Sequence, residues 1–257
     1  MSLPLSGLGV LVTRPAGQAE RLQARLRELG AHPVLFSTLE ILPPADTSIL
    51  ARRLAELPNY DLAIFVSPTA AQYGLSGIPI WPAGLRVAAI GQGTAVALRA
   101  AGIEQVLVPS EGGDSEHLLA LPELADMTGQ RVLIFRGEGG RELLAESLAA
   151  RGATVEYAEC YRRGLPVADP ASLLTIWRQG GIQAVTVLSS QGLDNLFTLL
   201  GERNAELIRA TPLFAPHPRI AEHARALGVI HADAAHTGEA GLLQCLVEYF
   251  AHDRKPS

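Results

Sequence analysis

The sequence predicts an α/β protein built from two similar units, each with a doubly wound parallel sheet. Two observations lead to this fold class. Residues 10–31 recur 122 positions later, at 132–153, with nine of 22 positions identical and no gap. Short runs that are apolar on both faces also alternate with amphipathic helical patterns, which is typical of parallel sheets covered by helices on both sides.

The repeat extends well beyond its first segment. At the same offset, residues 61–71 fall on residues 183–193, with Ser67 over Ser189. Further on, residues 86–103 match a segment within 211–229 at an offset of 126. Three matched segments in the same order indicate that the chain contains two copies of one α/β unit.

The first copy shows the pattern of elements clearly. Residues 9–13 form a strand candidate, and residues 18–29 follow as an amphipathic helix that Gly30 ends. Two extended stretches, 39–44 and 159–166, end in proline and fit neither pattern, so they are the best candidates for linkers. Further strands are expected at residues 34–36, 62–66, 87–90 and 106–108.

Composition excludes several classes of protein. With 48% apolar and 18% charged residues the chain is not disordered, and no apolar run approaches the roughly 18 residues of a membrane span. No basic segment precedes an apolar stretch at the start, so we expect a cytoplasmic protein rather than a secreted one. The net charge of −5 argues against general binding of nucleic acid.

Metal and lysine chemistry find little support. Two cysteines cannot form a disulfide framework, and His231 and His236 lack metal-ligand spacing, so no metal site is expected. Lys255 is the only lysine among 21 basic residues. Because P-loop and Schiff-base chemistry both need a lysine, they are excluded, and anions must meet arginines or backbone N–H groups.

Two glycine-containing turns follow predicted strands and open helices. Gly91, Gly93 and Thr94 lie in the first, where free N–H groups can hold an anion. Val96 stands where the third glycine of a dinucleotide fingerprint belongs, and a plain turn is equally well supported. Arg136 and the glycine-rich residues 137–140 form a similar turn in the second copy, where solvated charges are the simpler interpretation.

Serines occupy two further turns of this kind. Ser67 in the first copy, and Ser189, Ser190 and Gly192 in the second, end a strand and begin a helix. Each serine is more readily explained as a helix N-cap than as a binding residue. A functional interpretation gains weight because all these turns fall at the carboxyl ends of strands, where open α/β sheets bind ligands.

Tyr161 stands apart as a lone tyrosine in a polar linker, beside Arg162 and Arg163. From local context, a ring that only packs is as well supported as a functional group.

The ordered motif series resembles the uroporphyrinogen-III synthase family. It comprises VLVTRPAGQAERLQARLRELGA, FVSPTAA, AAIGQGTAVALRAAG, VLIFRGEGGRELLAESLAARGA, ECYRR and VLSSQGLDNL, and it covers nearly the whole chain. The resemblance implies two intertwined domains, residues 1–37 with 168–257 and residues 46–157, joined by a two-stranded connector at 38–45 and 158–167. The duplication by itself would equally suit two consecutive halves.

The resemblance also implies an activity in porphyrin and heme biosynthesis. Members are lyases that close hydroxymethylbilane into uroporphyrinogen III, losing water and inverting ring D without a cofactor. The substrate is a linear tetrapyrrole, with hydroxymethylbilane synthase a candidate for handing it over, and we expect a monomer. The alternative is a non-catalytic two-domain sensor of an anionic small molecule, since the same turns would serve it.

Site residues follow from the resemblance position by position. Tyr161 matches a tyrosine that helps the hydroxyl leave, Thr94 matches a cleft threonine, and Ser67 and residues 189–192 match turns that offer N–H groups. Arg14 and Arg136 follow paired strands, and either substrate binding or a salt bridge would explain them. At residues 215–219 the family's glycine-proline-threonine turn is missing, so His217 or Arg219 would have to replace its contact. The expected substrate-binding set is Arg14, Ser67, Gly91, Gly93, Thr94, Arg136, Gly137, Ser189, Ser190, Gly192 and His217.

Overall fold

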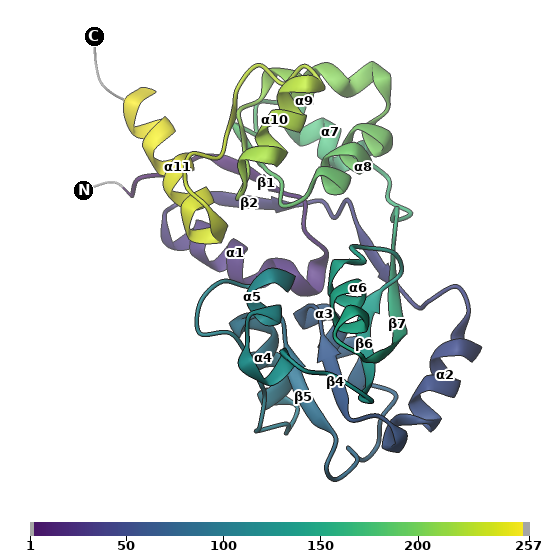
Figure 1. Cartoon of the computed structure of the whole chain (residues 1–257). Helices are drawn as coiled ribbons and strands as arrows, with labels where there is room; N and C mark the ends of the chain where they lie inside the picture. The colour runs from purple at the N-terminus through teal and green to yellow at the C-terminus, as the bar shows by residue number, and fades with distance from the viewer. Residues whose placement is uncertain (1–2, 254–257) are drawn as a thin grey trace. The chain divides into compact units, whose positions relative to one another are not determined.

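The computed structural model describes residues 3–253, so Lys255 lies outside it. The chain divides into two compact units (Figure 1). Unit 1 contains residues 1–40 and 164–257, and unit 2 contains residues 41–163. Unit 1 is therefore built from both ends of the chain and unit 2 from its middle.

Unit 1 has a parallel sheet in the order β10-β9-β8-β1-β2. Side chains alternate between its faces, with Val10 and Val12 in one apolar cluster and Leu11 in another. In Figure 1, α1 and α11 cover one face and α7 to α10 cover the other. The strands are β1 (Gly9–Val12), β2 (His32–Leu35), β8 (Ala184–Thr186), β9 (Leu213–Phe214) and β10 (Ala232–Asp233). The helices are α1 (Ala16–Glu28), α7 (Ala171–Arg178), α8 (Ser190–Leu200), α9 (Ala205–Ala210), α10 (Pro218–Ala226) and α11 (Gly238–Asp253), with a 3₁₀ turn at Glu202–Asn204.

Unit 2 has a sheet in the order β3-β7-β6-β4-β5. Alternation again sends Leu133 and Phe135 to the face covered by α3 and α4, and Val132 and Ile134 to the face covered by α5 and α6. The strands are β3 (Glu40–Leu42), β4 (Leu62–Phe65), β5 (Arg86–Ala89), β6 (Arg131–Gly137) and β7 (Thr154–Gly164). The helices are α2 (Thr47–Ala55), α3 (Pro68–Leu75), α4 (Gln92–Ala100), α5 (Ser115–Leu119) and α6 (Leu143–Ala150), with 3₁₀ turns at Leu57–Asn59 and Pro122–Leu124.

Both sheets obey the 122-residue offset, and each combines parts of both copies. In unit 1 Val10 pairs with Ala184, and in unit 2 the offset positions Val132 and Leu62 pair in the same way. The sheet of each unit thus combines the first strand pair of one copy with the later strands of the other copy. The predicted α/β class with intertwined, doubly wound parallel sheets is confirmed.

The helix-ending glycine predicted at Gly30 is also present. Helix α1 stops at Glu28, and Gly30 adopts φ = +93°, a left-handed conformation that favours glycine. Its counterpart in the second copy, Gly152, has φ = +94°. The two copies therefore end their first helix with the same device.

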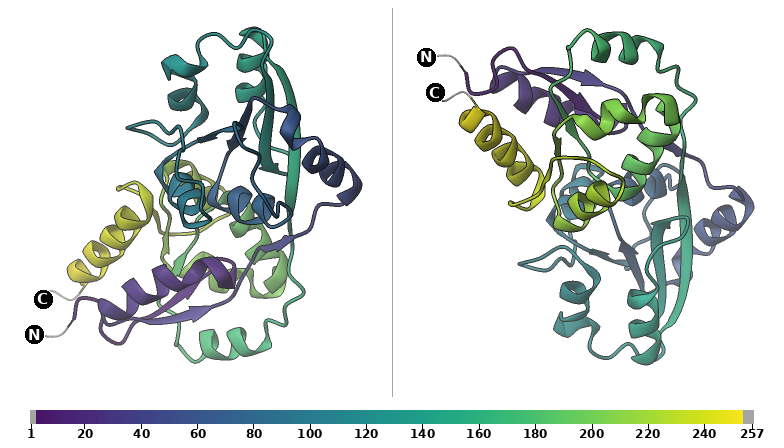
Figure 2. Two further views of the ribbon diagram at one scale, coloured as in Figure 1. Left: turned by 90° about the horizontal axis from the view of Figure 1, so that it is seen from below. Right: turned by 90° about the horizontal axis from the view of Figure 1, so that it is seen from above.

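Two predictions of elements need correction. The strand expected at residues 106–108 is reduced to an isolated bridge between Ala88 and Leu107, so this edge of the sheet lacks a regular strand. The stretch 159–166 is not a linker throughout, because β7 continues to Gly164 and can be followed as a long strand in Figure 2. The residues of this stretch are polar although they form a strand. Strand β3, from the other extended stretch, lies beside β7 at the sheet edge, as the expected two-stranded connector requires.

No helix within residues 3–253 is long and apolar enough to cross a bilayer. In the same part of the chain, no three His, Cys, Asp or Glu side chains are grouped so that they could hold a metal ion.

Candidate functional site

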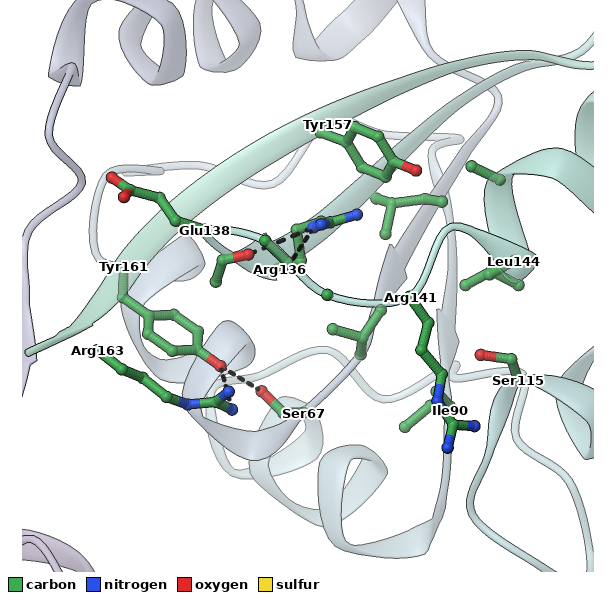
Figure 3. Close-up of a pocket in the computed structure, with 16 residues that line it drawn as sticks. Ser67, Ile90, Ser115, Arg136, Glu138, Arg141, Leu144, Tyr157, Tyr161 and Arg163 are labelled. Atoms are coloured by element: carbon green, nitrogen blue, oxygen red, sulfur yellow. Dashed lines mark hydrogen bonds between the residues drawn. The ribbon is translucent and has the colours of Figure 1, made fainter. Parts of the chain in front are cut away.

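A pocket of about 210 Å³ lies at the carboxyl ends of the unit 2 strands (Figure 3). Ser67 comes from the end of β4, Arg136 and Gly137 from the end of β6, and Tyr161 from β7. Parallel strands all end at one edge of their sheet, and open α/β sheets bind ligands there. Four residues of the expected site therefore line one pocket.

Tyr161 is the central polar group of this pocket. It is 2% exposed, and its hydroxyl oxygen lies 3.4 Å from Ser67 Oγ and 3.5 Å from Arg163 Nη2. Figure 3 shows Ser67 and Arg163 converging on this hydroxyl. The placement of Tyr161 in a polar linker was wrong, because the residue is buried within strand β7.

The hydroxyl of Ser67 has a structural task as well. It caps helix α3 by accepting the N–H of Ala70 at 2.9 Å, so the N-cap interpretation is confirmed. Arginine can only donate hydrogen bonds, so Arg163 meets a lone pair of the Tyr161 oxygen. The phenolic proton is then directed at Ser67 or at a bound ligand.

Arg136 is engaged by its own turn. Its side chain is 8% exposed, Nη1 donates to Glu142 Oε1 at 3.0 Å, and Nε donates to the carbonyl oxygen of Gly139 at 3.0 Å. The guanidinium also lies 4.3 Å from the centre of the Tyr157 ring, a cation–π distance. The salt-bridge interpretation thus holds for Arg136, although the residue lines the pocket.

Glu142 and Tyr157 complete this network. The Tyr157 hydroxyl donates to Glu142 Oε2. Burial, followed by the hydrogen bond to Glu142, raises the pKa of Tyr157 to about 12. The hydrogen bond from Tyr157, followed by that from Arg136, lowers the pKa of Glu142. At neutral pH the turn is therefore held by a charged carboxylate between a neutral phenol and a guanidinium.

The pocket favours anions. Three guanidinium groups line it, those of Arg136, Arg141 and Arg163, against one carboxylate, that of Glu138. Arg141 is 69% exposed, and its Nη1 lies 3.9 Å from Glu116 Oε1, a contact worth little in water. Arg141 and Arg163 are therefore the arginines best able to turn towards a carboxylate. Apolar side chains of Ile90, Ile134 and Leu144 provide a surface for a ring.

The glycine turn after β5 lies in the same unit but outside the pocket lining. Gly91 is the N-cap of α4, and a Cβ there would lie 2.9 Å from the Cα of Gly113. Thr94 is buried at 2% exposure on the first turn of α4. Close packing thus explains why this position is a glycine, while the contribution of Gly91, Gly93 and Thr94 to binding stays a prediction.

The other expected residues belong to unit 1. Arg14 Nη1 lies 2.7 Å from Glu239 Oε2, so the salt-bridge interpretation holds for this arginine too. Ser189 caps α8 by accepting the N–H of Gly192 at 3.0 Å, and Ser190 opens that helix. His217 is exposed at the N-cap position of α10 and makes no side-chain capping bond. Their binding roles stay predictions.

Sequence reasoning missed Arg141, Arg163, Ser115 and Tyr157 as lining residues. One signal could have found Arg163. Residues two apart on a strand share a face, so Arg163 follows Tyr161 once residues 159–164 are recognised as strand. No comparable pattern marks Ser115, which the fold brings to the pocket from α5.

Comparison with known proteins shows which family the chain belongs to. The family model described as "Uroporphyrinogen-III synthase HemD" matches residues 20–244. The chain belongs to the uroporphyrinogen-III synthase family. The uroporphyrinogen-III synthases of Salmonella typhimurium and Escherichia coli are each 37% identical over 227 residues, covering 86% of this chain and 92% of theirs. That of Synechococcus elongatus is 31% identical over 208 residues, covering 77% of this chain and 76% of its own.

Solved structures support the fold. A mutant uroporphyrinogen III synthase from Thermus thermophilus matches with a TM-score of 0.57 at 21% identity, covering 96% of this chain and all of that one. The uroporphyrinogen-III synthetase of Helicobacter pylori gives a TM-score of 0.59 at 13% identity, covering 94% and 99% of the two chains. The intertwined α/β fold described here is thus that of solved uroporphyrinogen-III synthases.

Proposed function

We propose that this chain is a lyase that closes hydroxymethylbilane into uroporphyrinogen III, with loss of water and inversion of ring D. Membership of the uroporphyrinogen-III synthase family over residues 20–244 supports the reaction. The observation that carries the site is the buried Tyr161 hydroxyl, met by Ser67 and Arg163 in a pocket lined by arginines. Because the matched relatives are named as synthases, the sensor alternative is not retained.

The pocket suits the first chemical step. The lone pair of a pyrrole nitrogen expels the substrate's hydroxyl, which takes a proton from Tyr161 and leaves as water. The substituted α carbon of ring D then attacks and forms a spiro intermediate. The bond from that carbon to its original methylene bridge breaks, and the methylene re-bonds to the free α carbon of the same ring, which inverts it. The hydrogen that this free carbon loses on rearomatisation is the proton that balances the one Tyr161 donates. Arg163 accepts no hydrogen bond, so it holds the tyrosine oxygen while leaving the phenolic proton to the substrate.

Orientation is the larger part of the catalysis. The azafulvene formed when water leaves is electrophilic enough to react without an attacking side chain, so the protein must decide which carbon attacks it. A volume of about 210 Å³ is below the roughly 300–1,000 Å³ of a pocket for a whole drug-sized ligand. The pocket therefore takes part of the tetrapyrrole, with Arg141 and Arg163 as donors to its carboxylates.

The remaining expected residues belong to the same proposal. Arg14, Ser189, Ser190, Gly192 and His217 in unit 1 would contact other parts of the substrate. Gly91, Gly93 and Thr94 would offer backbone N–H groups from the start of α4, which suits carboxylates. We further propose that the enzyme works without a cofactor as a cytoplasmic monomer that receives its substrate from hydroxymethylbilane synthase.

The decisive experiment couples the purified protein to enzymatic production of hydroxymethylbilane and separates the porphyrin isomers. We expect the type III isomer, whereas type I alone, the product of spontaneous closure, would overturn the proposed activity. Tyr161→Phe should lower kcat about tenfold and leave the thermal unfolding midpoint near that of the wild type, since positioning dominates. Unchanged kcat in this variant would remove Tyr161 from the chemistry.

A further inference from the structure

Strand β7 carries one extra residue just before the tyrosine. From Arg131 opposite Thr154 to Arg136 opposite Glu159 the register of β6 and β7 is regular, and then Gly137 stands opposite Tyr161. Cys160 is therefore the unpaired residue of a β-bulge. Bulges turn the side chains that follow them and are frequent beside active sites.

The bulge is anchored by its own side chain. Cys160 is 3% exposed, and its Sγ lies 3.3 Å from the carbonyl oxygen of Arg136 and 3.6 Å from that of Ala70. Burial raises the pKa of the Cys160 thiol to about 12, so the thiol keeps the proton that it donates to these carbonyls. The extra residue is thus tied to the end of β6 and to helix α3.

The tyrosine ring then lies against Gly137. A Cβ placed on Gly137 would lie 2.7 Å from both Cε2 and Cζ of Tyr161 and 3.1 Å from its hydroxyl oxygen. Gly137 is not among the glycines with positive φ, so its backbone conformation accepts other residues. Any side chain at this position would displace the ring and with it the hydroxyl.

The other copy of the repeat provides an internal comparison. At the 122-residue offset, Gly137 corresponds to Pro15 and Tyr161 to Leu39. The copy that lacks the tyrosine has a residue with a Cβ where the copy with the tyrosine has glycine. Glycine and tyrosine therefore occur together, at the pocket.

We infer that Gly137 is a positioning residue for Tyr161: its missing side chain sets where the phenolic hydroxyl stands between Ser67 and Arg163. This inference rests on the role proposed above for Tyr161. It goes further, because Gly137 acts through the ring that lies on it rather than through a contact with substrate.

The test is a double-mutant cycle on kcat with Gly137→Ala and Tyr161→Phe. In the wild-type background Gly137→Ala should lower kcat about tenfold, with KM changed less than twofold. In the Tyr161→Phe background it should lower kcat less than twofold, because the hydroxyl that it misplaces is already gone. Equal losses in both backgrounds, or full activity of Gly137→Ala, would overturn the inference.

A stability measurement separates this inference from the role of the tyrosine. Gly137→Ala should lower the thermal unfolding midpoint in the wild-type background and lower it much less in the Tyr161→Leu background, because the branched side chain frees the space beside the new methyl. An equal loss in both backgrounds would contradict the steric argument, even if Tyr161→Phe proved inactive. If Tyr161→Phe kept full kcat, the tyrosine's role would fail whatever the stability measurement showed. Gly17→Ala, in α1 with nothing within 4 Å of its added Cβ, is the matched control and should keep full activity.

Discussion

At the carboxyl edges of their sheets, the two copies of the repeat keep the same supporting contacts. Ser67 in unit 2 and Ser189 in unit 1 each accept the N–H three residues on and cap a helix. Cys160 and its counterpart Thr38 each direct a side-chain donor at a backbone carbonyl near the end of the neighbouring strand, that of Arg136 at 3.3 Å and that of Thr13 at 3.2 Å. The architecture of this edge is therefore common to both units.

Other side chains at this edge differ between the units. Unit 2 has Tyr161 on Gly137, where unit 1 has Leu39 and Pro15. Both copies keep an arginine at the end of their first strand, Arg14 just after β1 and Arg136 near the end of β6, but the counterion of each comes from a different place. In unit 2, Arg136 pairs with Glu142 of the same turn. In unit 1, Arg14 pairs with Glu239 of the distant helix α11.

This contrast separates the contacts that both copies need for folding from the residues that one copy adds for chemistry. Caps and buried donors satisfy backbone groups that any such edge exposes, so both copies retain them. The tyrosine, its glycine and the compact arginine turn add a buried acid and a fixed cation to one copy. Substitutions at matched positions can therefore separate architecture from chemistry.

The largest effect on stability should come from the paired arginines. Arg136→Ala should lower the free energy of unfolding by about 2 kcal/mol, because hydrogen bonds to a carboxylate and a carbonyl and a ring contact are lost from a buried site. Arg14→Ala should cost about 1 kcal/mol or less, since that ion pair is partly exposed. Urea denaturation of both variants measures the difference, and equal losses would show that the turn of unit 2 is no more tightly held.

Substitution of the capping serines should have a smaller effect on stability and should affect activity in only one of the two units. Ser67→Ala and Ser189→Ala should each lower the free energy of unfolding by about 1 kcal/mol, the usual cost of losing an N-cap. Only Ser67→Ala should lower kcat/KM by several-fold, because its hydroxyl is 3.4 Å from that of Tyr161. Ser189→Ala keeps the backbone N–H groups and should stay within twofold of wild type in the isomer assay.

Matching losses of kcat/KM in the two serine variants would contradict the assignment of the acid to unit 2. Thr198→Ala on α8 is a suitable reference variant, since the exposed hydroxyl of Thr198 donates a hydrogen bond to the carbonyl of Asp194 within the same helix.

The fold was predictable because it depends on short-range patterns and on the repeat. Apolar runs gave the strands, the Gly30 stop gave the end of α1, and the offset matched the register of Val10 with Ala184 and of Val132 with Leu62. The reduction of the expected strand at 106–108 to a single bridge at Leu107 was not predictable, because nothing in the local sequence distinguishes such a bridge from a regular strand.

The site was predictable only in part, for a physical reason. Turns after strands can be located from sequence, and Ser67, Arg136 and Gly137 do line the pocket. The burial of Tyr161 depends on a one-residue register shift at Cys160, and the counterion of Arg14 comes from Glu239, far along the chain. Such long-range pairings leave no local periodicity to read.

The smallest effect concerns the phenol that holds the turn of unit 2. Leu35 takes the place of Tyr157 in unit 1, so this hydrogen bond to a glutamate is a feature of one copy. The pKa of Tyr157 is raised to about 12 from 10.0, so its neutral form is favoured by folding. That contribution to stability is complete below pH 10 and is lost as the pH rises through about 12.

Ultraviolet absorbance of the phenolate measures this directly, and Tyr60 provides the matched control. The pKa of Tyr60 is also raised to about 12, chiefly by burial, but its carboxylate partner is Glu156, away from the pocket lining. Tyr157→Phe and Tyr60→Phe should each remove one phenol that ionises near pH 12. Only Tyr157→Phe should lower kcat/KM, by about twofold, because Glu142 loses the hydrogen bond from Tyr157 and then holds Arg136 less firmly. If Tyr60→Phe lowered activity equally, the effect would belong to the stability of unit 2 as a whole and not to the turn that distinguishes it from unit 1.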